Sequence, residues 1–184
     1  DIAVSITAIT ADQISADQIY DLSDLAEGVP GFETAKGVGS GSGFVLRGIG
    51  SYGVGAAVVS SIVTSINGHS TNPSWFVETG FLDLERIEVL QGPQGTKFGR
   101  NSVQGVINLV TKRPTDEFEG YVNVEAGSYD RKLVTGAINM PFSDSVRGRL
   151  AFGSNTRRGM VENVATGNLT VSYTHLTLPT IQPV

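Results

Sequence analysis

The pattern of apolar and polar positions divides the chain near residue 114. Before this point, short apolar runs alternate with helical spacings and with turns rich in Gly and Pro. After it, longer segments alternate between apolar and polar at every second residue. The first part therefore predicts a small α+β domain with a mixed sheet and short helices, and the second part predicts a series of antiparallel strands.

The first ten residues predict a short, half-buried strand, because they alternate weakly. The positions expected on its apolar side are Ile2, Val4, Ile6 and Ala8. Helical signals follow, since Thr10 with Gln13 and Ser15 with Gln18 both have the spacing of a capping box. Apolar positions 22, 25, 26 and 29 then form one stripe, which predicts a short helix at about residues 22–27.

Four further runs in the first part predict short strands, at residues 44–49, 58–66, 86–90 and 106–111. The first of these runs carries Arg47. The second ends at Asn67-Gly68, a dipeptide that favours the positive φ angles of a tight hairpin turn. Residues 92–95, Gly-Pro-Gln-Gly, predict a β-turn with proline at its second position.

The second part contains three amphipathic segments, at residues 118–126, 134–140 and 146–155. Their length is close to the ~9–11 residues with which a tilted strand crosses a bilayer. The connection at residues 141–145 is short. Strands of a soluble β-sandwich alternate in the same way, so periodicity alone leaves both architectures open.

Composition excludes several classes of protein. The chain has no Cys, which rules out disulfides and thiolate metal sites, and its net charge of −5 argues against nucleic-acid binding. The longest weakly polar stretch, residues 56–66, is far shorter than the ~20 residues of a membrane helix. We expect no cofactor and no metal, since His69 has no second ligand at a suitable spacing.

An enzyme is a weak alternative. The glycine-rich residues 37–43 could form a phosphate-binding loop, but they lead into Phe44-Val45-Leu46 rather than into Lys-Ser/Thr and a helix. Glu85 and Glu88 could form an acid–base pair, but a spacing of three places them on opposite faces of a regular strand. We therefore expect no enzymatic activity.

A family resemblance decides between these readings. Residues 85–114, ERIEVLQGPQGTKFGRNSVQGVINLVTKRP, resemble the most recognisable stretch of the TonB-dependent receptor plug. Three shorter stretches agree with it at the right intervals, namely DLSDLAEGVPGF, FVLRGIGS and INGHS. Residues 119–155 are similar to the first three barrel strands of the family, with MPFSD as the short periplasmic turn.

The resemblance implies a fragment of an active transporter in the cell outer membrane, with the plug in the lumen of a β-barrel of about 22 strands. Such a receptor binds a scarce small-molecule nutrient, usually a ferric siderophore, haem, cobalamin or an oligosaccharide, and receives energy through the partner protein TonB. Of these nutrients we expect a ferric siderophore. Its other partner is outer-membrane lipid, and nucleic acid is not expected. The alternative is a periplasmic ligand-binding module that uses the plug fold alone.

The resemblance also implies roles for particular residues. Arg47 and Arg100 match the two plug arginines that pair with glutamates of the barrel wall, although each could instead cap a surface turn. The candidates for substrate contact are Ser51, Tyr52, His69, Ser70, Asn72 and Trp75, and for Trp75 packing against the barrel wall is the alternative. The residues expected to shape the backbone at turns and close contacts are Gly92, Pro93, Gly95, Gly99 and Gly105.

These observations predict three regions. Residues 1–114 are the plug, residues 115–171 are the first three barrel strands, and residues 172–184 are a non-native tail. Within the tail, SYTHLTLPT resembles the translation of an adapter used in preparing sequencing libraries. We expect no fourth strand there and no function for His175. A TonB box is not visible, and the chain does not begin with Met.

Overall fold

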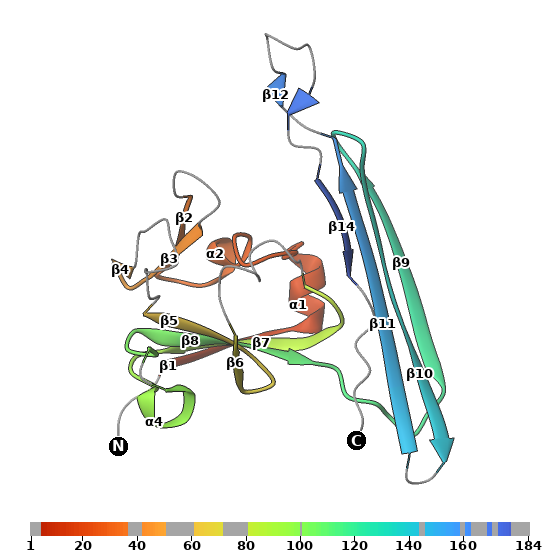
Figure 1. Ribbon diagram of the computed structural model, residues 1–184, viewed down its shortest axis with the longest axis horizontal. Coiled ribbons are helices and arrows are strands. Elements are labelled where there is room, and N and C mark those ends of the chain that lie inside the picture. The colour runs from red at the N-terminus through yellow and green to blue at the C-terminus, as the bar shows by residue number, and fades with distance from the viewer. Residues whose placement is uncertain are drawn as a thin grey trace. The chain divides into compact units, whose positions relative to one another are not determined.

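The computed structural model describes residues 5–36, 42–50, 61–71, 81–99, 101–143, 146–158, 161–162, 169–170 and 173–177. The chain forms two compact units, Asp1–Thr111 and Lys112–Val184. Figure 1 shows the helices and strands of both.

The amino-terminal unit is a small α+β domain with two sheets. Its elements in chain order are β1 (Ser5–Thr10), α1 (Ala11–Ala16), α2 (Leu25–Gly28), β2 (Phe32–Lys36), β3 (Ser42–Leu46), β4 (Ile49–Gly50), β5 (Ile62–Ile66), β6 (His69–Thr71), β7 (Leu84–Gln91), α4 (Gly95–Phe98) and β8 (Gly105–Thr111). The larger sheet has the order β1-β7-β8-β5-β6, and β5 pairs with β8 in parallel while the other pairs are antiparallel. The smaller sheet has the order β2-β3-β4.

The helices of this unit are short. Thr10 and Gln13 form the predicted capping box at the start of α1. Ser15 and Gln18 do not start a helix, and this prediction was wrong, because α1 already ends at Ala16 and Gln18 has a φ of 52°. No helix in the described part of the chain is long and apolar enough to cross a membrane.

The first strand turns its other side to the core. Ile9 is buried opposite Ile87 of β7, whereas Ile6 lies opposite Leu90 and is exposed. The prediction that Ile6 and Ala8 lie on the apolar side was therefore wrong. β1 is an edge strand, and the core packs against the face that carries Ile9. Ile2 and Val4 lie outside the described residues.

One continuous core lies between the larger sheet and the segment that contains α2. It consists of apolar side chains from both, together with residues of β2 and β3: Ile9, Ile19, Leu22, Leu25, Val29, Phe32, Phe44, Leu46, Ile62, Leu84, Ile87, Val89, Ile107 and Leu109. The predicted helix at residues 22–27 is confirmed in part, since a turn precedes α2 at Leu25. On the opposite face of the sheet, Phe98 of α4 packs with Val63 and Val106.

The carboxy-terminal unit is an antiparallel sheet. Its elements are β9 (Glu119–Gly127), β10 (Arg131–Ser143), β11 (Val146–Arg157), β12 (Val161–Glu162), β13 (Leu169–Thr170) and β14 (Tyr173–Thr177). The main sheet has the order β14-β11-β10-β9, and β12 pairs with β13. β10 continues through Pro141 to Ser143 across a register shift, so the connection to β11 is shorter than predicted.

The tail contributes a strand, contrary to our expectation. Tyr173–Thr177 forms β14 and pairs antiparallel with β11, from Gly153↔Thr177 to Arg157↔Tyr173. The open edge of β11 offers unpaired amides and carbonyls, to which a short extended segment can add with little demand on its sequence. This pairing therefore gives His175 a place in a strand. The origin of residues 172–184 stays a prediction.

Candidate functional site

Arg47 lies at the tip of a tight hairpin rather than within a strand. β3 ends at Leu46 and β4 begins at Ile49, and the φ angles of Arg47 and Gly48 between them are 55° and 74°. Two successive positive φ angles are typical of a type I′ turn. The prediction of one strand over residues 44–49 was wrong, because Gly48 permits a reversal that the apolar pattern does not reveal.

Two hydrogen bonds attach Arg47 to neighbouring segments. Its backbone N–H donates to the carbonyl of Gly31 at 2.7 Å, and its Nε–H donates to Oε1 of Gln91 at 2.9 Å. Gln91 ends β7, is only 8% exposed, and donates from Nε2 to the carbonyl of Pro30 at 3.4 Å. Arg47 itself is exposed, and no carboxylate of the described residues lies within ion-pair distance of it.

His69 and Ser70 lie elsewhere on the unit, at the start of β6. The His69 side chain is exposed, whereas Ser70 donates from Oγ to the carbonyl of Phe98 at 3.3 Å. Hydrogen bonds among the described residues join neither of them to Arg47, which is on the smaller sheet. The structure thus places the predicted barrel contact and the predicted ligand contacts at separate hairpins.

The other predicted site residues lie outside the described part of the chain. They are Ser51, Tyr52, Asn72, Trp75 and Arg100. Among the residues that are described, no group of three His, Asp or Glu side chains could hold a metal ion.

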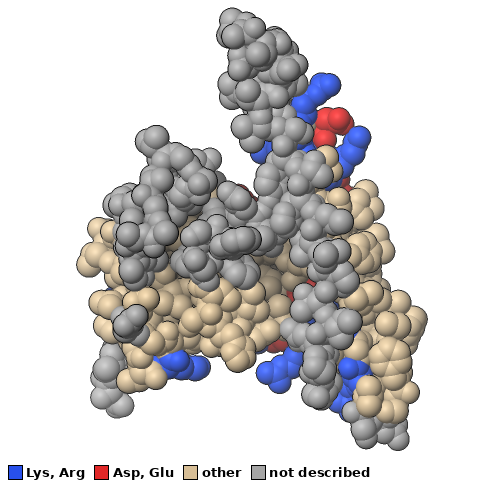
Figure 2. Space-filling view, viewed as in Figure 1, with Lys and Arg blue, Asp and Glu red and all other residues tan. Residues whose placement is uncertain are grey.

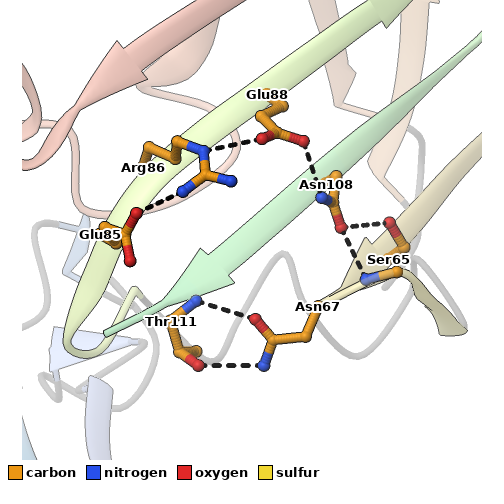
Figure 3. A network of polar contacts seen from close by, with 8 residues as sticks. Ser65, Asn67, Glu85, Arg86, Glu88, Asn108 and Thr111 are labelled. Carbon is orange, nitrogen blue, oxygen red and sulfur yellow. Dashed lines mark hydrogen bonds and ion pairs between the residues drawn. The ribbon is translucent and has the colours of Figure 1, made fainter. Parts of the chain in front are cut away.

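A row of polar side chains crosses three strands of the larger sheet (Figure 3). Glu88 of β7, Asn108 of β8 and Ser65 of β5 are direct neighbours in the register. Asn108 donates from Nδ2 to Oε2 of Glu88 at 2.9 Å, and its Oδ1 accepts from Ser65 Oγ at 2.8 Å and from the Gly68 N–H at 3.0 Å. Because Ser65 and Asn108 are buried, these bonds satisfy groups that would otherwise be costly to bury.

A second asparagine holds the same hairpin turn. Asn67 and Gly68 have φ angles of 50° and 84°, as predicted for this dipeptide. Asn67 accepts from the Thr111 N–H at 3.1 Å and donates to Thr111 Oγ1 at 3.0 Å, and its own N–H donates to the Leu109 carbonyl at 2.9 Å. The turn that precedes His69 is therefore tied to the end of β8 by both side chain and main chain (Figure 3).

Arg86 extends the polar row to a second carboxylate. Its Nε donates to Oε1 of Glu88 at 2.7 Å, and its Nη1 pairs with Glu85. We expected Glu85 and Glu88 on opposite faces, but the register of β7 shifts between Leu84 and Arg86, and this irregularity lets both carboxylates reach one guanidinium. The cluster consequently links residues of β7 by ion pairs.

The surroundings of Glu88 keep it ionised at neutral pH. Burial alone would raise the pKa of Glu88, but the hydrogen bonds from Asn108 and Arg86 and the charge of Arg86 outweigh burial and lower the pKa below the ordinary 4.5. The pKa of Arg86 is raised, chiefly by its hydrogen bond to Glu88. Because the folded pKa of Glu88 is the lower one, its stabilising contribution is complete above about pH 4.5 and is lost as the pH falls through the folded value.

Replacing Glu88 with glutamine is expected to lower the free energy of unfolding by about 1–2 kcal/mol at pH 7, because the charged partner of Arg86 and Asn108 is lost. The difference from wild type should shrink as the pH falls from about 4.5 through the lowered folded pKa of Glu88, because the carboxyl group becomes protonated there. Urea unfolding monitored by circular dichroism at several pH values measures both effects. Glu85→Gln is the control, since Glu85 is more exposed, and its effect should be smaller. A difference for Glu88→Gln that is constant with pH would contradict this account.

The connection between β7 and β8 contains one turn of helix, α4, which the sequence pattern did not predict. Gly92 and Gly99 have φ angles of 107° and 90°, a region that favours glycine. Gly95 starts α4 with open space around it, and Pro93 is exposed. At Gly105 the constraint is a close approach, since a Cβ there would lie 2.4 Å from the Leu90 carbonyl oxygen and 2.7 Å from Leu46 Cδ2.

Gln91 and Asn108 are among the residues of these clusters that sequence reasoning missed. Asn108 interrupts the apolar run of β8, and Gln91 follows the alternating residues of β7 directly. A polar residue inside a strand that is otherwise buried requires a partner, and this requirement was the available signal. The partners themselves are 20 or more positions away, so only the folded chain identifies them.

Comparison with known proteins gives a consistent answer. The family model that matches, the TonB-dependent Receptor Plug Domain, covers residues 1–106. The iron-regulated outer membrane virulence protein of Vibrio cholerae is 27% identical over 164 residues, which are 84% of this chain and 25% of that protein. The ferric-pyoverdine BN7/BN8 receptor of Pseudomonas putida is 27% identical over 167 residues, 86% of this chain and 19% of the receptor. The chain thus spans about a quarter or less of the length of these relatives.

Among solved structures, the ferric yersiniabactin uptake receptor FyuA from Yersinia pestis matches with a TM-score of 0.80 and 23% identity, over 91% of this chain and 26% of that one. This likeness confirms the predicted α+β plug fold. These relatives are named as an outer membrane protein and as a receptor rather than as enzymes, in agreement with the predicted outer-membrane location. Since the family model matches more than half of the chain, the protein belongs to the TonB-dependent receptor plug domain family.

Proposed function

We propose that this chain is the plug and the first barrel strands of an outer-membrane transporter that imports a ferric siderophore with energy supplied through TonB. The observation that carries the proposal is the distribution of side chains on the sheet formed by β9, β10 and β11. One face of this sheet is apolar and at least partly exposed on most residues, and the other combines polar residues with small or buried apolar ones.

The apolar face follows from the register. In one row, Val124 of β9 lies opposite Val134 of β10. In the next, Val122, Gly136 and Phe152 lie side by side. The row after that contains Ile138 and Leu150. Val122 and Val124 are 64% and 73% exposed. In water such an exposed apolar face would promote aggregation, whereas in a bilayer it contacts lipid. In Figure 2 the visible surface of this sheet carries few charged residues between its two ends.

The opposite face suits the interior of a barrel. Asn139 is fully buried, and its Nδ2 donates to the carbonyls of Thr115 and Glu117 while its Oδ1 accepts from the Thr115 N–H. Next to it in the register, Arg149 pairs with Glu119 at 3.5 Å. Outer-membrane strands alternate in this way, apolar toward lipid and polar toward the lumen.

The lengths of the strands agree with this assignment. β10 and β11 contain 13 and 12 residues, enough to cross a bilayer at a tilt. Phe118 and Phe142 are exposed near the strand ends, where barrels carry aromatic residues at the membrane interface. A sheet of these few strands has open edges, so the remaining strands of the closed barrel have to come from the rest of the receptor.

The cargo is proposed from the relatives, whose names include ferric-pyoverdine receptors and a ferric enterobactin receptor. Following the family resemblance, we assign to Arg47 and Arg100 the role of holding the plug against glutamates of the barrel wall. An arginine fork facing carboxylates in a partly dry lumen forms strong but exchangeable bonds. The predicted ligand contacts at His69 and Ser70, and at Ser51, Tyr52, Asn72 and Trp75, stay predictions.

The proposal is tested with the complete receptor that contains this chain. It should remain in the outer membrane after carbonate washing and should support uptake of radioactive iron, supplied as a panel of ferric siderophores, only in cells with TonB. Release by carbonate would support the alternative of a periplasmic module. Retention in the membrane without TonB-dependent iron uptake would contradict the proposed cargo and leave the barrel assignment intact.

A simpler experiment uses the chain itself. Expressed alone, residues 1–114 should be soluble in water, whereas residues 1–171 should aggregate unless detergent covers the apolar face. Sedimentation after expression, with and without detergent, measures the difference. Equal solubility of the two polypeptides in water would argue against a lipid-facing sheet.

A further inference from the structure

We propose that Gln91 is a positioning residue that holds the Arg47 guanidinium by its Nε–H and so restricts Arg47 to an end-on pairing with a carboxylate through Nη1 and Nη2. The inference rests on the proposed role of Arg47 in holding the plug to the barrel wall. It adds a residue to that role and states the geometry of the pairing.

The first step is the contact itself. The Arg47 Nε–H donates to Oε1 of Gln91 at 2.9 Å, a good hydrogen-bond distance. Gln91 is nearly fully buried at the end of β7, between β1 and β8, where it lies opposite Ser5 and Gly105. The acceptor therefore belongs to the interior of the sheet, while Arg47 is exposed.

The second step is the orientation of the Gln91 amide. Its Nε2 donates to the Pro30 carbonyl at 3.4 Å, so its Oε1 is the end that faces Arg47. The next residue, Gly31, accepts the backbone N–H of Arg47 at 2.7 Å. The backbone of Arg47 is thus bonded directly to Gly31, and its side chain is linked to Pro30 through Gln91. The left-handed turn fixes the direction in which the side chain leaves the hairpin.

The third step is a count of donors. A guanidinium has five N–H groups, and a carboxylate can bind it side-on through Nε and one Nη or end-on through both Nη atoms. The bond to Gln91 occupies Nε and removes the side-on mode. The end-on edge stays available, since no carboxylate of the described residues lies within ion-pair distance of Arg47. The partner is consequently a carboxylate that approaches along the axis of the side chain.

The contact is tested by NMR on the full chain in detergent micelles, with nitrogen-15 in the arginine side chains. The Arg47 Nε–H signal, assigned by its loss in Arg47→Lys, should exchange slowly with water. In Gln91→Leu its exchange should accelerate about tenfold, as expected for loss of one hydrogen bond to a charged donor. In Gln91→Glu it should stay slow, because a carboxylate oxygen still accepts at the same place.

Gln104→Leu is the matched control. It removes an amide from the same connection between β7 and β8, and the buried Gln104 Oε1 accepts no hydrogen bond from the described part of the chain. The Arg47 signal should therefore be unchanged in this variant. Equal exchange in wild type and Gln91→Leu, or equal acceleration in Gln91→Leu and Gln104→Leu, would overturn the proposal.

A double-mutant cycle in the complete receptor separates this inference from the function on which it rests. Hydrogen exchange in β7 and β8 reports how firmly the barrel holds the plug. Arg47→Ala and Gln91→Leu should each accelerate exchange, and the double variant should resemble Arg47→Ala alone. No effect of Arg47→Ala would contradict the proposed attachment to the barrel. If Arg47→Ala accelerates exchange and Gln91→Leu accelerates it further in the double variant, the attachment to the barrel stands and only the positioning role of Gln91 is contradicted.

Discussion

Replacing Gly105 with alanine should destabilise the amino-terminal unit by about 3 kcal/mol. The new Cβ would lie 2.4 Å from the Leu90 carbonyl oxygen, which belongs to the β7 backbone and cannot rotate away. It would also lie 2.7 Å from Leu46 Cδ2, so relief of the contact would displace the residue that precedes Arg47. Hydrogen–deuterium exchange of the full chain, read from peptides of β7 and β8, measures the loss.

Gly95→Ala is the control for this prediction. A Cβ at Gly95 meets nothing within 4 Å, and the residue lies in the first turn of α4. Alanine should therefore be neutral there or stabilise by up to about 1 kcal/mol through its lower unfolded-state entropy. Similar exchange in the two variants would show that β7 and β8 can separate to admit a methyl group.

Replacing Val124 with arginine should cost the complete receptor about 2–4 kcal/mol, if the residue lies near the middle of the bilayer. Val124 is the most exposed residue of the apolar face of β9, and a guanidinium there would have to leave water for lipid. Urea titration of receptor folded into lipid vesicles, followed by heat-dependent gel mobility, measures the change in folded fraction.

Asn123→Arg is the matched control on the adjacent residue. Its side chain is on the opposite face of β9, in the row with Thr135 and Gly153. In a barrel this face borders the aqueous lumen, and the substitution should change stability by less than about 1 kcal/mol. Equal losses for the two variants would exclude a lipid-facing apolar surface and with it the barrel assignment.

The polar clusters share one architectural principle. Each uses a buried amide with both ends engaged: Gln91 between Arg47 and Pro30, and Asn108 between Glu88 and the turn that precedes His69. An amide satisfied at both ends is costly to displace, because breaking one bond leaves a buried group unpaired. The two hairpins that present Arg47 and His69 are therefore fixed to the sheet by side chains as well as by backbone pairing.

Much of the fold followed from local patterns. The capping box at Thr10, the Asn67-Gly68 turn and the strands around Ile87, Ile107 and Val122 depend on a few neighbouring residues, and all of them are present. The failures involve information that a short window does not contain. The side of β1 that is buried depends on which face the rest of the unit covers, and the reversal at Arg47 and Gly48 depends on two positive φ angles that the apolar pattern does not reveal.

By itself, the sequence determined the family, the change from an α+β pattern to a strand pattern, and the Asn67-Gly68 turn, because these are encoded in contiguous motifs and in the period of apolar residues. Only the tertiary structure decided which polar side chains meet. Gln91 lies 44 positions from Arg47, and Ser65 lies 43 positions from Asn108. Such pairs form because strand register brings distant residues together, and register is set by the packing of the whole sheet rather than by either partner.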